Sequence, residues 1–151
     1  MKIRIEFVEP EEEEIILRVS ELNDTVKRIQ QTISEITTGK NTIALYKNET
    51  QYYIELNQIL FFETDGGQVR AHTVKEVFET KSKLFELEEI LPRSFMRVAK
   101  STILNINHVY SIRRNLTASS EVEFKNTHKK VFVSRNYYKA LIEKIEEKRF
   151  R

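Results

Sequence analysis

The segment FMRVAKSTILNINHVYSI, residues 95–112, carries the most informative pattern in this sequence. Its apolar residues follow neither a helical nor a strand period throughout, so packing alone does not explain their spacing. Arg97 and Lys100 flank a turn-like Ala99, and the two residues that follow have hydroxyls able to bond to local backbone. An apolar set comes next: Ile103, Leu104 and Ile106. The segment therefore predicts a basic loop held on a rigid core.

The same segment fits a longer motif of phenylalanine, any residue, arginine, three residues, serine, then an apolar pair, asparagine and isoleucine. A second motif, VFVSRNYY at residues 131–138, indicates a strand, a Ser-Arg pair and the start of a closing helix. In this order, the two motifs resemble those of the LytTR family of bacterial DNA-binding domains, over roughly residues 41–151. Residues 58–64, followed by Asp65-Gly66-Gly67, are similar to that family's first core strand and first DNA-facing loop.

From residue 41 onward the pattern is typical of short strands covered by helices. The expected strands are 42–46, 52–55, 59–63, 69–73, 74–81, 109–112, 121–125 and 130–134. A short helix is expected over residues 84–91, ended by Pro92, and a final helix from Asn136. The fold class is thus mostly β with short helices (α+β). The resemblance implies a multi-sheet antiparallel LytTR-like β fold with a C-terminal helix.

Residues 1–40 are expected to form a small ββα extension before the domain at 41–151. Residues 2–8 alternate apolar and charged side chains, which indicates a strand, and residues 15–19 look like its hairpin partner. From Ser20 the period becomes helical, with Ser20 or Asn23 as the cap. The apolar stripe of this helix is Leu22, Val26, Ile29, Ile33 and Ile36. It would cover the hairpin, the neighbouring domain or another subunit, and the last option makes the extension a candidate oligomerisation element.

The charges are unevenly distributed, although the net charge is only +2. Residues 97–151 contain 13 Lys and Arg against 5 Asp and Glu, whereas residues 1–96 contain 12 against 18. A basic excess within one part of a domain is the electrostatic pattern expected of a protein that binds the phosphate backbone.

The resemblance implies that loops of the β fold approach DNA, with Lys100 and Arg135 at the motif positions that the family uses for base and phosphate contacts. Arg135 has the geometry to donate two hydrogen bonds to guanine, and Lys100 to reach a guanine or a phosphate. Near the first loop, Gln68 is a candidate to read adenine and Arg70 to touch phosphate. The full candidate set is Lys100, Arg135, Gln68, Arg70, Arg97, Ser101 and Asn136. Within it, Arg97 has a second interpretation, as a brace for its own loop.

Several other functional classes find no support in the sequence. There is no cysteine, which excludes disulfides and thiolate chemistry, and the three histidines lie far apart without the spacing of a metal site. No nucleophile constellation and no glycine-rich phosphate loop is present, so we expect neither an enzyme nor a cofactor nor a small-molecule substrate. The N-terminus lacks the pattern of a signal peptide, and no run of 18 apolar residues occurs, which favours a cytoplasmic protein.

The expected partner is double-stranded DNA, at repeated sites bound by a homodimer. A phosphoacceptor receiver domain would need over a hundred further residues with an aspartate cluster, so the chain resembles a stand-alone member of the family. In some bacteria such small members are held in check by a membrane protein encoded beside them, and the resemblance extends that expectation here. The alternative is a protein-interaction module whose basic C-terminal face binds an acidic partner; an RNA binder is a third option, without an evident stacking motif.

Overall fold

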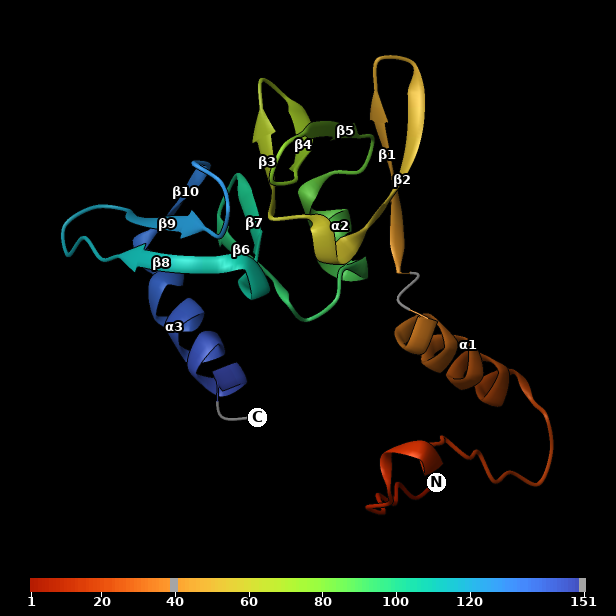
Figure 1. The fold of residues 1–151 in the computed structure, drawn as a ribbon. Coiled ribbons are helices and arrows are strands. Elements are labelled where there is room, and N and C mark those ends of the chain that lie inside the picture. Colours follow the sequence, from red (N-terminus) through yellow and green to blue (C-terminus); the bar gives the residue numbers. More distant parts are fainter. Residues whose placement is uncertain (39–40, 150–151) are drawn as a thin grey trace. The chain divides into compact units, whose positions relative to one another are not determined.

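The computed structural model describes residues 1–38 and 41–149. The chain divides into two units, Met1–Thr38 and Gly39–Arg151 (Figure 1). The domain boundary expected after Lys40 falls at residues 39–40, which lie outside the described residues.

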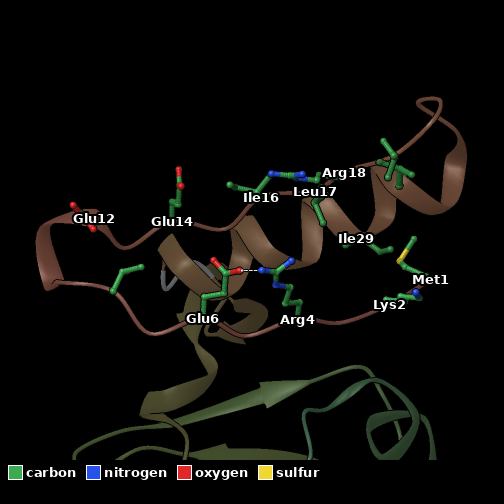
Figure 2. Close-up of a pocket in the computed structure, with 13 residues that line it drawn as sticks. Met1, Lys2, Arg4, Glu6, Glu12, Glu14, Ile16, Leu17, Arg18 and Ile29 are labelled. Atoms are coloured by element: carbon green, nitrogen blue, oxygen red, sulfur yellow. Dashed lines mark ion pairs between the residues drawn. The ribbon is translucent and has the colours of Figure 1, made fainter.

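The N-terminal unit contains helix α1 (Asp24–Thr38) and a 3-10 turn, η1 (Pro10–Glu12). Of the two cap candidates, Ser20 and Asn23, it is Asn23 that caps α1, because its Oδ1 accepts a hydrogen bond from the backbone N–H of Val26 at 3.0 Å. Figure 2 shows the chain before α1 running along the helix, where the two line a pocket that includes Leu17 and Ile29.

The hairpin expected at residues 2–8 and 15–19 is wrong, since the described residues 1–38 contain no strand. The apolar residues of the first segment are exposed to solvent: Ile3, Ile5 and Phe7 are 93%, 80% and 99% exposed. A two-stranded hairpin is marginal in water without a third strand or a helix packed on its apolar face. The sequence therefore has the alternating pattern of a strand, but within the described N-terminal unit no apolar surface covers residues 2–8 and stabilises a strand there.

The second unit is built on a seven-stranded antiparallel sheet with the strand order β2-β1-β5-β4-β3-β7-β6 (Figure 1). The strands are β1 (Thr42–Lys47), β2 (Thr50–Glu55), β3 (Phe61–Asp65), β4 (Gln68–His72), β5 (Val77–Thr80), β6 (Phe95–Ala99) and β7 (Thr102–Asn105). A 3-10 turn, η2 (Leu56–Gln58), links β2 to β3, and helix α2 (Leu84–Ile90) packs on the sheet through Leu84 and Leu87. The core here includes Leu45, Ile59, Phe62, Phe78, Phe95 and Ile103.

A three-stranded sheet, β10-β9-β8, and the C-terminal helix complete the fold. Its elements are η3 (Ile106–His108), β8 (Val109–Arg113), β9 (Ser120–Phe124), β10 (Lys130–Val133) and α3 (Arg135–Arg149). They enclose a second core that includes Leu60, Phe61, Val98, Leu104, Val122, Val133 and Leu141. The antiparallel β fold with a closing helix is thereby confirmed.

Strands β3 and β7 serve both cores, because successive side chains of a strand point to opposite faces. Phe62 and Ile103 belong to the first core, whereas their neighbours Phe61 and Leu104 belong to the second. All four residues of β7 are buried, which explains why the segment at 95–112 shows no clean alternation. The buried Asn105 is satisfied: its amide donates to the Ile59 carbonyl at 3.0 Å, and its Oδ1 accepts from the Asn107 N–H.

One strand was predicted too long. The strand expected over residues 74–81 is shortened to β5, because residues 73–76 close a turn in which the Thr73 N–H donates to the Glu76 carbonyl at 3.0 Å. Lys144 of α3 is half-buried and donates to the Phe95 carbonyl at 3.4 Å. The hairpin turn predicted at Gly66-Gly67 is confirmed, with φ of +60° and +80° at the two glycines.

Candidate nucleic-acid interface

Three connections meet at one end of the central strands: the β3–β4 turn, the β6–β7 turn and the β10–α3 junction. The Thr64 N–H donates to the Ser101 carbonyl at 2.9 Å, which fixes the first turn beside the second. The Ser134 N–H donates to the Val98 carbonyl at 2.9 Å, which fixes the junction beside β6. Segments separated in the sequence by 28 and 32 residues therefore form one surface, which we call the loop face: residues 64–68, 97–101 and 134–136.

Lys100 and Ser101 form the tip of the β6–β7 turn, and both are exposed. A β-bulge between Arg97 and Ala99 precedes the turn, a common device for redirecting side chains beside a functional site. Across the described residues, no hydrogen bond or ion pair is found for the Lys100 ammonium. The Ser101 hydroxyl lies 3.5 Å from that of Thr102. Lys100 therefore offers an unpaired positive charge on a well-supported turn.

Arg97 faces inward rather than toward solvent. Its Nε donates to the Ala99 carbonyl at 2.8 Å, and one terminal nitrogen donates to the Lys100 carbonyl at 2.5 Å. Its other terminal nitrogen pairs with the carboxylate of Glu88 in α2. This arrangement favours the interpretation of Arg97 as a brace for its loop over that of a DNA contact.

Arg135 and Asn136 are the first two residues of α3, and both side chains are exposed. Within residues 1–38 and 41–149, neither side chain has a hydrogen bond or an ion pair. The first turn of α3 contains no acidic residue, so Arg135 adds its charge to the positive end of the helix dipole. A cation at this end destabilises the helix when nothing is bound. The same end can bind a phosphate or the edge of a base.

Arg114 joins this surface; the sequence offers it as a basic candidate, but it was not among the seven residues selected as DNA contacts. Its guanidinium lies 4.9 Å from the ring centroid of Tyr138, one turn along α3 from Arg135. The adjacent Arg113-Arg114 pair in a polar loop was the available signal. Only the tertiary structure places that loop beside the start of α3.

Gln68 and Arg70 lie on β4, but both have internal partners. The Gln68 amide donates to the Thr80 carbonyl at 3.0 Å and so links β4 to β5. Arg70 donates to the Asp65 carboxylate at 3.3 Å, with 40% and 66% of the two side chains exposed. Gln68 is thus positioned as a support for the turn. The ion pair of Arg70 with Asp65 is exposed and weak, so Arg70 can leave Asp65 and bind a phosphate.

Two lysines of the basic C-terminal segment, Lys129 and Lys130, are partly buried or paired with carboxylates, and neither belongs to the loop face. Lys130 pairs with Glu121 at 2.8 Å and Glu123 at 3.6 Å, and the Glu121 hydrogen bond raises the pKa of Lys130. Lys129 donates to the carbonyls of Thr73 and Glu76 at 2.8 and 3.0 Å, and burial lowers its pKa. These two lysines stabilise the fold and leave fewer cations for DNA than the sequence count suggests.

His72, the last residue of β4, packs against aromatic residues of the second core, and its side chain is 13% exposed. Its ring stacks on Phe61 with centroids 4.3 Å apart, and Phe61 stacks in turn on Phe124. Its Nε2 lies 2.8 Å from the Glu63 carboxylate, while its Nδ1 is buried without a partner among the described residues. Burial lowers the pKa of His72 below its ordinary value of 6.5, with Glu63 opposing and Lys129 assisting that shift.

We expect the lowered pKa of His72 to make folding stability fall on acidification. Below about pH 6.5 the unfolded chain takes up a proton that the folded state binds less readily, so stability is lost from there down to the folded pKa. One proton changes the free energy of unfolding by at most about 1.4 kcal/mol per pH unit. The free energy of unfolding, measured with urea at several pH values between 7.5 and 5.5, should fall less on acidification in His72→Gln than in the parent. His128→Gln, a control at an exposed histidine, should behave as the parent does. Equal slopes in all three proteins would contradict this role.

No group of histidines, cysteines or carboxylates that could hold a metal ion is present in residues 1–38 and 41–149. In the same residues, no helix has the length and apolar character needed to cross a membrane.

Comparison with known proteins matches residues 49–146 to the family model described as the LytTr DNA-binding domain. The match spans β2 to β10, α2, and α3 as far as residue 146, and it includes all the residues of the loop face.

Similar proteins occur in Staphylococcus aureus, where they are named uncharacterized HTH-type transcriptional regulators. The proteins of strains NCTC 8325 and COL are each 26% identical over 147 residues, covering 96% of this chain and 98% of the relative. Their name refers to a helix-turn-helix. In the described part of this chain, however, α2 and α3 are separated by β6 to β10, so these two helices do not form that motif.

A solved structure, described as the LytTr DNA-binding domain of a DNA response regulator from Bacillus cereus, has the same fold. The TM-score is 0.65 at 22% sequence identity, over 71% of this chain and 98% of that chain.

Proposed function

The chain belongs to the LytTR family of DNA-binding domains, and from that premise we propose that it is a cytoplasmic transcriptional regulator that reads specific duplex DNA with its loop face. The observation that carries this proposal is the convergence of two unpaired cations, Lys100 and Arg135, on loops that backbone hydrogen bonds fix side by side. A rigid support reduces the ordering entropy lost on binding, so these cations are better placed than those of a free chain end.

The roles within the loop face follow from the surroundings of each side chain. Arg135 is assigned to a guanine edge, because its exposed guanidinium can donate two parallel hydrogen bonds. Lys100 is assigned to a guanine or a phosphate, and Ser101 and Asn136 supply shorter polar contacts beside them. Arg70 reaches a phosphate by leaving Asp65, whereas Gln68 supports the β3–β4 turn.

Binding to duplex DNA is expected to depend strongly on salt. If the loop face neutralises about five phosphates, the logarithm of the association constant should fall against the logarithm of salt concentration with a slope of about −4 to −5. The measurement is a set of binding isotherms at several salt concentrations, on a duplex selected from random DNA with the purified protein. Selected sites should contain imperfect repeats about one helical turn apart, which place two protomers on the same side of the duplex.

A scrambled duplex of the same length and composition serves as the control for specificity. A slope near zero on both duplexes would contradict the proposal and favour the alternative, a module that binds an acidic protein partner. Binding with a steep slope but without preference for the selected duplex would leave only a non-specific phosphate binder.

Self-association is assigned to the exposed part of the α1 stripe. Val26 is buried, whereas Ile36 of α1 is 71% exposed and Leu22, two residues before the first residue of α1, is 64% exposed. The helix is therefore shorter than the expected stripe, and the exposed apolar residues on it and just before it favour a second copy of the chain as the cover. Replacing Leu22 and Ile36 by Glu should therefore reduce a dimer to a monomer in sedimentation equilibrium, while the melting temperature changes little.

The matched control replaces Thr25 and Gln30 by Glu, since both are exposed positions of the same helix outside the stripe. If the variant with Glu at positions 22 and 36 is still a dimer, this assignment is wrong.

Inhibition by a membrane-bound protein, expected from the resemblance, stays a prediction.

A further inference from the structure

The Arg97 side chain spans three elements of the second unit. It starts from β6, donates to two carbonyls of the β6–β7 turn, and ends on Glu88, which lies in α2. The Arg97 side chain is 22% exposed and that of Glu88 is 44% exposed. Leu87, the residue before Glu88, is fully buried in the core, so α2 holds Glu88 at a defined place beside the turn.

We propose that Glu88 is a positioning residue for DNA recognition: with Arg97 it forms a clamp that holds the β6–β7 turn, and thus Lys100, in its binding geometry. This inference rests on the proposed function and adds to it a carboxylate that itself touches no DNA. Neither sequence motif includes Glu88.

The chemistry of the clamp depends on arginine in particular. A planar guanidinium can donate to the Ala99 carbonyl, the Lys100 carbonyl and a carboxylate at the same time, because its five N–H groups point in fixed directions. A lysine at position 97 keeps the charge but presents only one nitrogen. It therefore cannot hold all three partners in the same way.

Glu88 contributes by keeping the guanidinium on the turn. Its charge balances that of Arg97, so the arginine has less tendency to leave the turn for a phosphate. Without Glu88, the turn would have to be ordered when DNA binds, and that ordering weakens specific binding.

The sign of the effect separates this role from simple electrostatics. Removing a carboxylate from a DNA-binding domain reduces its repulsion of the polyanion and should strengthen binding to every duplex. The clamp predicts the opposite result on the specific duplex. Glu89 is the matched control, because it is the next residue of α2, is exposed and has no ion pair within the described residues.

The first experiment measures the clamp without DNA. The Thr64 N–H donates to the Ser101 carbonyl, so its hydrogen exchange reports whether the turn is in place. We expect Glu88→Gln and Arg97→Lys to accelerate exchange at Thr64 by roughly three- to tenfold, and Glu89→Gln to leave it unchanged. Unchanged exchange in both clamp variants would overturn the proposal, whatever the protein binds.

The second experiment measures binding to the duplex selected with the parent protein and to its scrambled counterpart. Glu88→Gln and Arg97→Lys should each weaken specific binding by roughly three- to tenfold, with the salt slope retained and the affinity for the scrambled duplex not reduced. The double variant should be no weaker than either single variant, because both break the same clamp. Glu89→Gln should bind at least as tightly as the parent.

Tighter specific binding by Glu88→Gln would overturn the inference, as would full affinity of Arg97→Lys, which would mark Arg97 as a simple phosphate contact. A parent protein whose binding shows no salt dependence would overturn the proposed function together with the purpose of the clamp. In that case the exchange measurement would still report separately whether the clamp holds the turn. Thermal melts of every variant confirm that the comparison is made between folded proteins.

Discussion

Replacing Arg135 by alanine is expected to weaken binding to the specific site by roughly 1 to 3 kcal/mol and to remove base preference at one position of that site. Its guanidinium is exposed at the start of α3 and has no partner in the described residues, so the change removes no internal contact. Val133, two residues before Arg135, is fully buried, and the Ser134 N–H donates to the Val98 carbonyl of β6, so the backbone that leads into Arg135 is held in place. Binding isotherms on the selected duplex and on single-base variants of it would measure both effects.

Lys148→Ala is the matched control for Arg135→Ala. Lys148 is an exposed cation near the other end of α3, so its loss changes the net charge equally but lies more than three helical turns from the β10–α3 junction. It should weaken binding to all duplexes slightly and alike, as expected for a distant charge. If folded Arg135→Ala bound its site as tightly as the parent, the reading position would be misplaced, and Arg114 would be the next candidate at this end of α3.

Replacing Leu104 by alanine is expected to lower the free energy of unfolding by roughly 2 to 5 kcal/mol. Leu104 is fully buried in the second core, on β7, between Met96 of β6 and Phe61 of β3. The substitution removes apolar contacts and leaves a cavity where strands on both sides are fixed by hydrogen bonds, so the site has little freedom to collapse. Urea unfolding, followed by circular dichroism, gives the change in free energy.

Leu104→Met keeps nearly the same volume and should lose less than about 1.5 kcal/mol. At a temperature where Leu104→Ala is still folded, its base preference should match that of the parent, because Leu104 does not reach the loop face. A loss below about 1 kcal/mol for Leu104→Ala would contradict the tight packing of the second core.

Local patterns predicted the helices of the second unit and most of its strands, but they did not predict β6 and β7 as separate strands. The turn at Gly66-Gly67 follows from the need for positive φ, which glycine adopts without strain, and the cap at Asn23 follows from a side chain suited to a helix start. The loss of alternation at residues 95–112 was also visible in advance. Its cause, a strand buried on both faces, required the second core.

The same kind of pattern was wrong where no core supports it. Residues 2–8 alternate as regularly as a strand should, yet Phe7 is almost fully exposed and no strand forms in the described N-terminal unit. An alternating sequence pattern indicates which face of a strand would be apolar if the strand formed. Whether a strand forms depends on what is available to pack against that face.

For the site, the family motif positions singled out Lys100 and Arg135, and their contacts with DNA stay a prediction. The tertiary structure decided which cations are available, since ion pairs and buried contacts form between segments distant in sequence. It directed Arg97 inward to Glu88, occupied Lys130 with Glu121, and brought Arg114 to Tyr138. A side chain's partner is set by the packing of strands and helices, and only the folded chain contains that information.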